Sequence, residues 1–280
     1  MSFLGDPLRE PDRNFEKGGR SFYFFDFDDN VVHLNTQIIL FHRDGREVGV
    51  STTEYANVHA LVGKPGTEWA DFEVRYDPQT GSYRNFRDHP RERLNGRQQP
   101  LVEDMLGAMA NPMVDWRGPS WNFFVHAVNN TRPISVITAR GHHPHTLRRA
   151  IDLLVLSKDL PANPSYLSLY PVSHPETRTK LGDPDGREST AELKKRAIKA
   201  AVQDAFECYG ENPHHRFGMS DDDPSNVALI REAFLDLKRS HPENAFFVFN
   251  TYGRQLVREE VQDDGSLKTD TLPTEQIKLF

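Results

Sequence analysis

The stretch that decides the fold is SFYFFDFDDN, residues 21–30. Its first half is almost entirely aromatic, and three aspartates follow within the second half. A short apolar run that ends abruptly in acids is typical of a buried β-strand whose carboxyl end opens on solvent. We therefore expect a strand at 21–25, a turn at Asp29-Asn30, and a group of carboxylates where the strand ends.

Outward from this strand, short apolar runs alternate with amphipathic stretches through the second half of the chain. Strands are predicted at 133–138, 166–172, 216–220 and 245–250, and helices at 145–156, 190–209 and 225–239, with a loop at 175–189. Such alternation indicates a parallel sheet covered by helices on both faces. The predicted fold class is thus α/β, with a Rossmann-like parallel sheet.

The segment that follows the first strand has a different pattern. Residues 37–41 and 47–50 are apolar-rich and flank an Asp-Gly turn, which predicts a β-hairpin, or flap. From 51 to 128, Pro, Gly and Arg interrupt the pattern, which favours an inserted cap-like region. The predicted organisation is a flexible arm at 1–20, a core at 21–50 and 129–265, the insertion at 51–128, and a tail at 266–280.

Composition limits the classes of partner. The chain has 280 residues, with 34 Lys plus Arg against 41 Asp plus Glu, and its formal net charge is −7. This acidity argues against long nucleic acid as a partner. The single cysteine, Cys208, excludes an internal disulfide framework. No apolar run approaches the roughly 18 residues of a membrane span, so we expect no membrane span and a cytoplasmic location.

Acidic and hydroxyl side chains follow several of the predicted strands. Asp26 and Asp28 follow the first strand, Thr138 ends the second, and three aspartates at 221–223 follow the fourth. Ligands of open α/β sheets bind beyond the carboxyl ends of the strands, where these groups converge. Carboxylates brought together repel one another unless a cation lies between them. Oxygen ligands of this kind favour Mg2+, which is the predicted cofactor.

The order of these groups resembles the motifs of the haloacid dehalogenase (HAD) superfamily of phosphatases. Asp26-Phe27-Asp28-Asp29-Asn30 resembles its first motif, Thr138 its second, and Asp222-Asp223-Pro224-Ser225-Asn226 its acidic fourth. The polynucleotide 3'-phosphatase-like and lipin-like branches come closest in overall form. Asn226 departs from the pattern, because many relatives carry a further acid there.

The resemblance implies a role for each motif residue. Asp26 is the expected nucleophile and Asp28 the general acid and base, while Thr138 and a lysine contact the phosphoryl group. Lys194 and Lys195 are the candidates for that lysine, with Lys199 and Lys180 as alternatives. The expected metal ligands are Asp26, Asp28, Asp222 and Asp223, with Asp221 in place of Asp222 if the strand ends one residue earlier.

The backbone N–H groups of Arg140 and Gly141, just after Thr138, are expected to bind the substrate anion. The predicted function is a magnesium-dependent phosphohydrolase that works through an aspartyl-phosphate intermediate. Its substrate would be a phosphorylated small molecule or a phosphorylated end group. Two alternatives stay open: an inactive HAD-fold protein that binds metal or phosphate in a regulatory role, and a phosphotransferase that uses the same aspartates.

Overall fold

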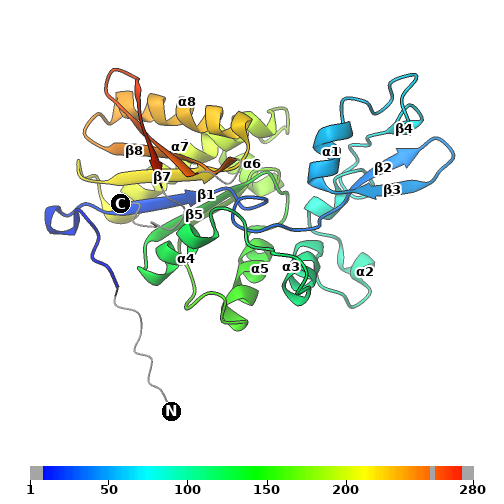
Figure 1. Cartoon of the computed structure of the whole chain (residues 1–280), viewed down its shortest axis with the longest axis horizontal. Coiled ribbons are helices and arrows are strands. Elements are labelled where there is room, and N and C mark those ends of the chain that lie inside the picture. The colour runs from blue at the N-terminus through cyan, green and yellow to red at the C-terminus, as the bar shows by residue number, and fades with distance from the viewer. Residues whose placement is uncertain (1–8, 253–255, 273–280) are drawn as a thin grey trace, which may run out of the picture. The chain divides into compact units, whose positions relative to one another are not determined.

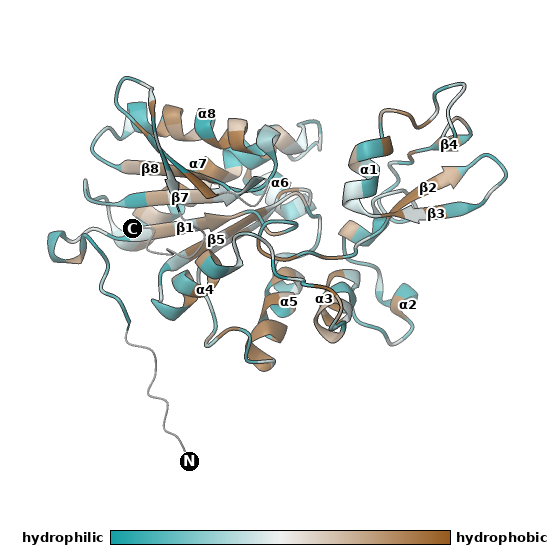
Figure 2. Ribbon diagram, viewed as in Figure 1, coloured by the Kyte–Doolittle hydropathy of each residue, from teal (hydrophilic) through white to brown (hydrophobic). Residues whose placement is uncertain are grey.

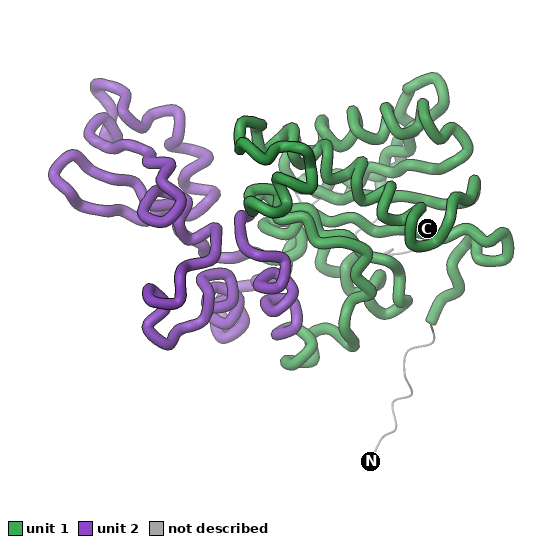
Figure 3. Tube along the Cα trace, turned by 180° about the vertical axis from the view of Figure 1, so that it is seen from behind, with its two compact units in different colours: residues 1–33, 117–139, 154–280 green, residues 34–116, 140–153 purple. Residues whose placement is uncertain are grey.

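The computed structural model describes residues 9–252 and 256–272, and its chain forms two compact units. Unit 1 holds the described residues among 1–33, 117–139 and 154–280, and unit 2 holds 34–116 and 140–153 (Figure 3). Within the described ranges, no helix is both long and apolar enough to cross a membrane.

Unit 1 is built on a seven-stranded sheet. Its strands are β1 (Ser21–Phe25), β5 (Pro133–Thr138), β6 (Ser165–Pro171), β7 (Arg216–Asp221), β8 (Ala245–Asn250), β9 (Leu256–Val261) and β10 (Leu267–Leu272). The spatial order is β10-β9-β8-β7-β1-β5-β6. β9 is antiparallel to both of its neighbours, β8 and β10, and all the other neighbouring strands pair in parallel. The predicted α/β fold class is therefore confirmed, and the sheet is mostly parallel, with antiparallel pairing at β9 that the sequence did not predict.

The chain changes direction across the sheet next to β1. From β1 it proceeds to β5 and β6 on one side, and then returns to β7 and β8 on the other side. The carboxyl ends of β1 and β7 therefore flank a topological switch point, where open α/β sheets bind their ligands.

Helices cover both faces of this sheet, as predicted. The helices of unit 1 are α4 (Trp121–Asn129), α6 (Pro175–Lys180), α7 (Thr190–Tyr209) and α8 (Pro224–Ser240), and α5 (Pro144–Leu156) has residues in both units. Phe22 and Phe24 point from β1 into the core under α7 and α8. Phe25 points the opposite way and meets Phe124 of α4 with 5.3 Å between ring centroids. Figure 1 shows α4 on the side of the sheet away from α7 and α8.

The core of unit 1 follows from the sequence pattern. All five residues of β1 are buried, and so are all six of β5, because helices cover both of their faces. α7 buries one stripe that includes Leu193, Ile198 and Val202, while its other face is charged. Figure 2 shows the same division, with apolar strands between amphipathic helices.

Unit 2 has a small antiparallel sheet in the order β3-β2-β4. Its elements are β2 (Ile38–His42), β3 (Glu47–Val50), α1 (Thr52–Val58), β4 (Phe72–Glu73), η2 (Arg84–Phe86), α2 (Arg91–Leu94) and α3 (Pro100–Ala110). Ile38, Leu40 and Val50 form its buried centre, against which aromatic side chains of the insertion pack.

The units divide the chain differently from the predicted domains. The hairpin β2–β3 was assigned to the core, but β2 pairs with β4 and packs with the insertion in unit 2. Residues 117–128 belong to unit 1 because α4 packs on its sheet, and 140–153 belong to unit 2.

Some local predictions also differ from the structure. Residues 175–180, expected in a loop, form α6. Residues 267–272, expected in the tail, pair with β9 as β10. Part of the expected flexible arm is hydrogen-bonded to the core: Asp12 accepts from the N–H and hydroxyl of Ser21, at 2.8 and 2.7 Å. The rest of the arm, 1–8, and of the tail, 273–280, lies outside the described residues.

Candidate functional site

Three carboxylates meet at the switch point of unit 1. Asp26 directly follows β1, Asp221 is the last residue of β7, and Asp222 is the next residue in the chain. One ligand oxygen from each lies within 4.8 Å of the others. Asp221 is fully buried and Asp26 is 5 % exposed, whereas Asp222 is half-buried. The two strand ends thus concentrate three carboxylates in one place, two of them buried and one half-buried.

Lys194 enters this cluster from α7. Its Nζ donates to Asp26 Oδ1 at 2.6 Å and lies 3.5 Å from Asp221 Oδ2. Ser189 caps the start of α7 by accepting from the N–H of Glu192 at 3.1 Å, so Lys194 lies in the second turn, beside the buried stripe. The sequence predicted that Lys194 would be aimed along this stripe, and the structure places it there.

The charges in the cluster perturb one another's ionisation. Burial raises the pKa of Asp26 well above its usual range, against the attraction of Lys194 and with the repulsion of Asp221. Burial alone would lower the pKa of Lys194, but Asp26 and Asp221 raise it above its ordinary value. Burial also raises the pKa of Asp222 to about 7, helped by Asp221 and Asp29. One lysine therefore does not fully compensate three carboxylates.

Asp28 and Thr138 form a second contact at the same edge. The hydroxyl of Thr138, at the end of β5, donates to Asp28 Oδ2 at 3.2 Å. Asp28 lies in a compact turn in which Asp29 has a left-handed backbone, with φ of 59°. Val31 and Val32 close this turn by donating to the carbonyl of Phe27, at 3.0 and 3.1 Å. The predicted pair of Asp26 and Asp28 is thus carried on one ordered turn.

The surroundings of Asp221 fit a divalent cation. Its Oδ1 accepts from the N–H of Asp223 at 3.0 Å and from the side-chain amide of Asn226 at 3.2 Å. Its buried Oδ2 faces the ammonium of Lys194 at 3.5 Å, an ion pair that it shares with Asp26. A second cation would compensate the buried negative charge more fully than this one lysine does. Together with Asp26 and Asp222, Asp221 makes an all-oxygen set, which is what Mg2+ prefers.

Other predicted residues have different surroundings. Asp223 is not one of the three clustered carboxylates; it caps α8, accepting from the N–H of Ser225 at 2.7 Å. Lys195 Nζ bonds to Glu232 at 3.1 Å, and Lys199 Nζ to Asp236 at 2.7 Å, both on α8. Lys180 Nζ donates to the Tyr170 hydroxyl at 2.8 Å. Of the four lysines, Lys194 is the one that contacts the carboxylates.

Arg140 and Gly141 belong to unit 2. The buried Arg140 side chain donates to the hydroxyl of Thr36 at 2.8 Å and stacks over the ring of Phe86. The N–H of Gly141 donates to the carbonyl of Phe86 at 2.8 Å. This N–H, predicted to bind the substrate anion, is therefore used within unit 2 itself.

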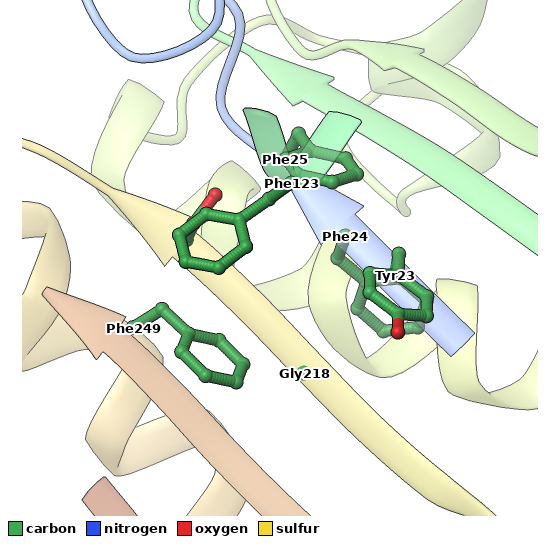
Figure 4. A pocket seen from close by; sticks show the side chains of 7 residues that line it. Tyr23, Phe24, Phe25, Phe123, Gly218 and Phe249 are labelled. Carbon is green, nitrogen blue, oxygen red and sulfur yellow. The ribbon is translucent and has the colours of Figure 1, made fainter. Parts of the chain in front are cut away.

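A small pocket in unit 1 lies among residues of β1, α4, β7 and β8 (Figure 4). It is lined by Tyr23, Phe24, Phe25, Phe123, Gly218, Ser220 and Phe249. Five of these side chains are aromatic and none is ionised at neutral pH. The pocket lacks the charged groups that the cluster at the strand ends supplies.

Sequence reasoning assigned two asparagines no positive role. Asn226, whose amide weakened the expected match to the fourth motif, instead positions Asp221 through the contact described above. The sequence places Asn30 in a turn, as the last residue of the first HAD-like motif, and in the structure its side chain is fully buried. The sequence signal for its role was an amide side chain at the end of an acidic run, four residues after Asp26, because an amide can donate a hydrogen bond where a carboxylate cannot.

These features define a class: an α/β protein with an acidic cluster and a buried lysine at the switch point of its sheet. Comparison with protein-family models, with curated proteins and with solved structures found no match. The function is therefore argued from the site itself.

Proposed function

We propose that this protein is a magnesium-dependent phosphohydrolase of the HAD type. The observation that carries the proposal is the cluster of Asp26, Asp221 and Asp222 at the carboxyl ends of β1 and β7, with Lys194 paired to the first two. Several acids and one buried cation, at the place where α/β sheets bind ligands, suit a phosphoryl group with its metal. The HAD resemblance assigns the role of flap to the hairpin β2–β3 and that of cap to the insertion.

Asp26 is the proposed nucleophile. Its carboxylate attacks phosphorus, an acyl-phosphate bond forms, and the bond to the leaving oxygen breaks. Lys194 stabilises the ionised form of Asp26, and its positive charge also faces the phosphoryl oxygens. Bound Mg2+, held by Asp26, Asp221 and Asp222, would supply further positive charge for those oxygens.

Asp28 is the proposed general acid and base. It gives a proton to the leaving oxygen in the first step, and in the second step it takes one from the water that attacks the acyl phosphate. The hydroxyl of Thr138 orients its carboxyl group through the hydrogen bond of 3.2 Å. The result is hydrolysis of a phosphate monoester, on a phosphorylated small molecule or a phosphorylated end group.

Release of phosphate from an aryl phosphate ester, with Mg2+ and with a chelator, tests this proposal. We expect turnover that requires Mg2+ and disappears in Asp26→Asn. Asp223→Asn is the matched control, because this nearby aspartate caps α8 and keeps an oxygen for that cap after the change. Mg2+ binding without turnover of any phosphate ester would favour the regulatory, metal-binding alternative. A new phosphorylated alcohol, formed when acceptors are added, would favour the phosphotransferase.

A further inference from the structure

Asp26 and Asp221 can share a ligand only if the main chains that carry them stay close together beyond the last hydrogen-bonded pair of β1 and β7. Their last paired residues are Phe25 and Ser220, and one further backbone bond joins the N–H of Asp26 to the carbonyl of Ser220 at 3.1 Å. After that point the chain leaves β1 through the turn at 27–32. The candidate ligands Asp26 and Asp221 lie where the regular hydrogen bonding stops.

Asn30 supplies this link. Its Nδ2 donates to the carbonyl of Asp26 at 3.2 Å and to the carbonyl of Ser220 at 2.9 Å, with Ser220 Oγ at 3.0 Å. The first of these residues carries the proposed nucleophile, and the second directly precedes Asp221. One amide group therefore ties together the main chains on which two of the three clustered carboxylates are mounted.

The other end of the same amide is held as well. Its Oδ1 accepts from the hydroxyl of Ser120 at 2.7 Å and from that of Thr251 at 3.0 Å. Thr251 in turn donates its N–H to the carbonyl of Asp221 at 3.2 Å. Asn30 is fully buried, and both ends of its amide are hydrogen-bonded. Since backbone carbonyls only accept, the NH2 group must face Asp26 and Ser220, so the orientation of the side chain is fixed.

We infer that Asn30 is a positioning residue that sets the separation between Asp26 and Asp221, and thereby the metal affinity of the site. Aspartate, which has the same shape, could not replace it, since a carboxylate would meet two carbonyl oxygens with no proton to donate. This inference rests on the proposed function, because it takes the cluster to be a metal site.

Calorimetric titration with Mg2+ alone tests this inference, at a pH above the pKa of Asp222. Outer groups that orient metal ligands typically change metal affinity by roughly 10- to 100-fold when removed. We expect a loss in that range for Asn30→Ala. Thr251→Val is the matched control: it removes one hydroxyl that donates to Oδ1 and leaves the hydrogen bonds from Nδ2 to the carbonyls of Asp26 and Ser220. It should lower the melting temperature and leave the Kd for Mg2+ unchanged.

The possible outcomes distinguish the proposed metal site from the positioning role of Asn30. Failure of the native protein to bind Mg2+ would contradict the proposed metal site. Native binding with the same Kd in Asn30→Ala, accompanied only by a lower melting temperature, would overturn the positioning role and leave a purely structural one. If Asn30→Ala does not fold, Asn30→Ser carries the same test, because a single hydroxyl proton cannot be donated to the carbonyls of both Asp26 and Ser220. A weakened Kd in that variant supports the inference and an unchanged Kd overturns it.

Discussion

Lys194 and Lys195 are neighbours in the sequence with very different surroundings. Lys194 is 5 % exposed and paired with Asp26, whereas Lys195 makes its ion pair with Glu232 at the surface of α8. The sequence alone left both as candidates, because each lies near the buried stripe of the same helix. The contact of Lys194 with Asp26 and Asp221 depends on how α7 packs against the sheet, which is a tertiary feature.

This difference predicts unequal effects of the same substitution. Lys194→Met leaves buried carboxylates without their cation, which typically costs about 3–5 kcal/mol of unfolding free energy. Lys195→Met removes only a surface pair, typically worth about 0–1 kcal/mol. Urea unfolding in the presence of a chelator measures both changes. Equal losses for the two variants would contradict the assignment of Lys194 to the cluster.

We expect Asp222 to make the proposed Mg2+ binding depend on pH. Its pKa is raised to about 7 chiefly by burial, so below that pH a proton competes with Mg2+ for the carboxylate. We expect the Mg2+ affinity to rise about tenfold per pH unit between about pH 5 and pH 7, and then to level off. Titrations across this range with the native protein and with Asp222→Asn check this. The slope should be reduced in the variant; an unchanged slope would assign the proton to another group.

The same shift has a consequence for stability without metal. Because the folded state holds the Asp222 proton more tightly than the unfolded state, ionisation of this group destabilises the fold. The contribution to the free energy of unfolding therefore falls as the pH rises from roughly 4 to 7, and is constant above. Denaturant unfolding of the native protein and Asp222→Asn, in chelator, should converge at low pH and separate at neutral pH, with the variant more stable there. No separation would contradict this account.

At the scale of elements, α8 begins at an aspartate that the sequence assigned to the metal. Asp223 caps this helix and Pro224 occupies its first turn. Loss of such a cap typically costs about 1 kcal/mol. We expect that loss for Asp223→Ala, measured by urea unfolding, while Asp223→Ser keeps most of the stability. If instead Asp223→Ala weakens Mg2+ binding, Asp223 acts as the ligand that the sequence predicted.

Elements with a clear local sequence pattern could be predicted, whereas strands specified mainly by pairing with distant residues could not. β1, β5 and α7 have the bounds expected from the sequence. β1 and β5 are short apolar runs that are buried throughout, and the apolar residues of α7 repeat with the period of a helix. β9 and β10 were not predicted: they are rich in charged residues and are specified by pairing across the sheet. β4 contains only two residues, too few for any periodicity.

The same limit applies to the candidate site: its residues at strand ends could be predicted, but its contacts between distant residues could not. Asp26, Asp28, Thr138 and the acids after β7 follow strands that the sequence could locate, so their convergence followed from parallel topology. The hydrogen-bond partners of Asn30 could not be predicted, because Ser120, Ser220 and Thr251 are distant in the sequence.

At the scale of the whole molecule, each unit has a core of its own. Leu40 is fully buried in unit 2, whereas Phe217 is fully buried among the strands and helices of unit 1. Leu40→Ala should lower the free energy of unfolding of unit 2 by about 2–5 kcal/mol and leave that of unit 1 unchanged. Hydrogen exchange should then accelerate in β2 and β3 and stay unchanged in β1 and β7, with the reverse for Phe217→Ala. Equal acceleration in both units by either variant would show one cooperative core.

The central claim is that Asp26 carries the phosphoryl group during turnover. Reduction of an acyl phosphate with borohydride marks the aspartate that held it, and mass spectrometry of the resulting peptides locates the mark. With an aryl phosphate ester and Mg2+, the mark is predicted on the peptide that contains Asp26, and it should be absent when chelator replaces Mg2+. Phosphate release with the mark on another residue, or with no mark, would contradict the account.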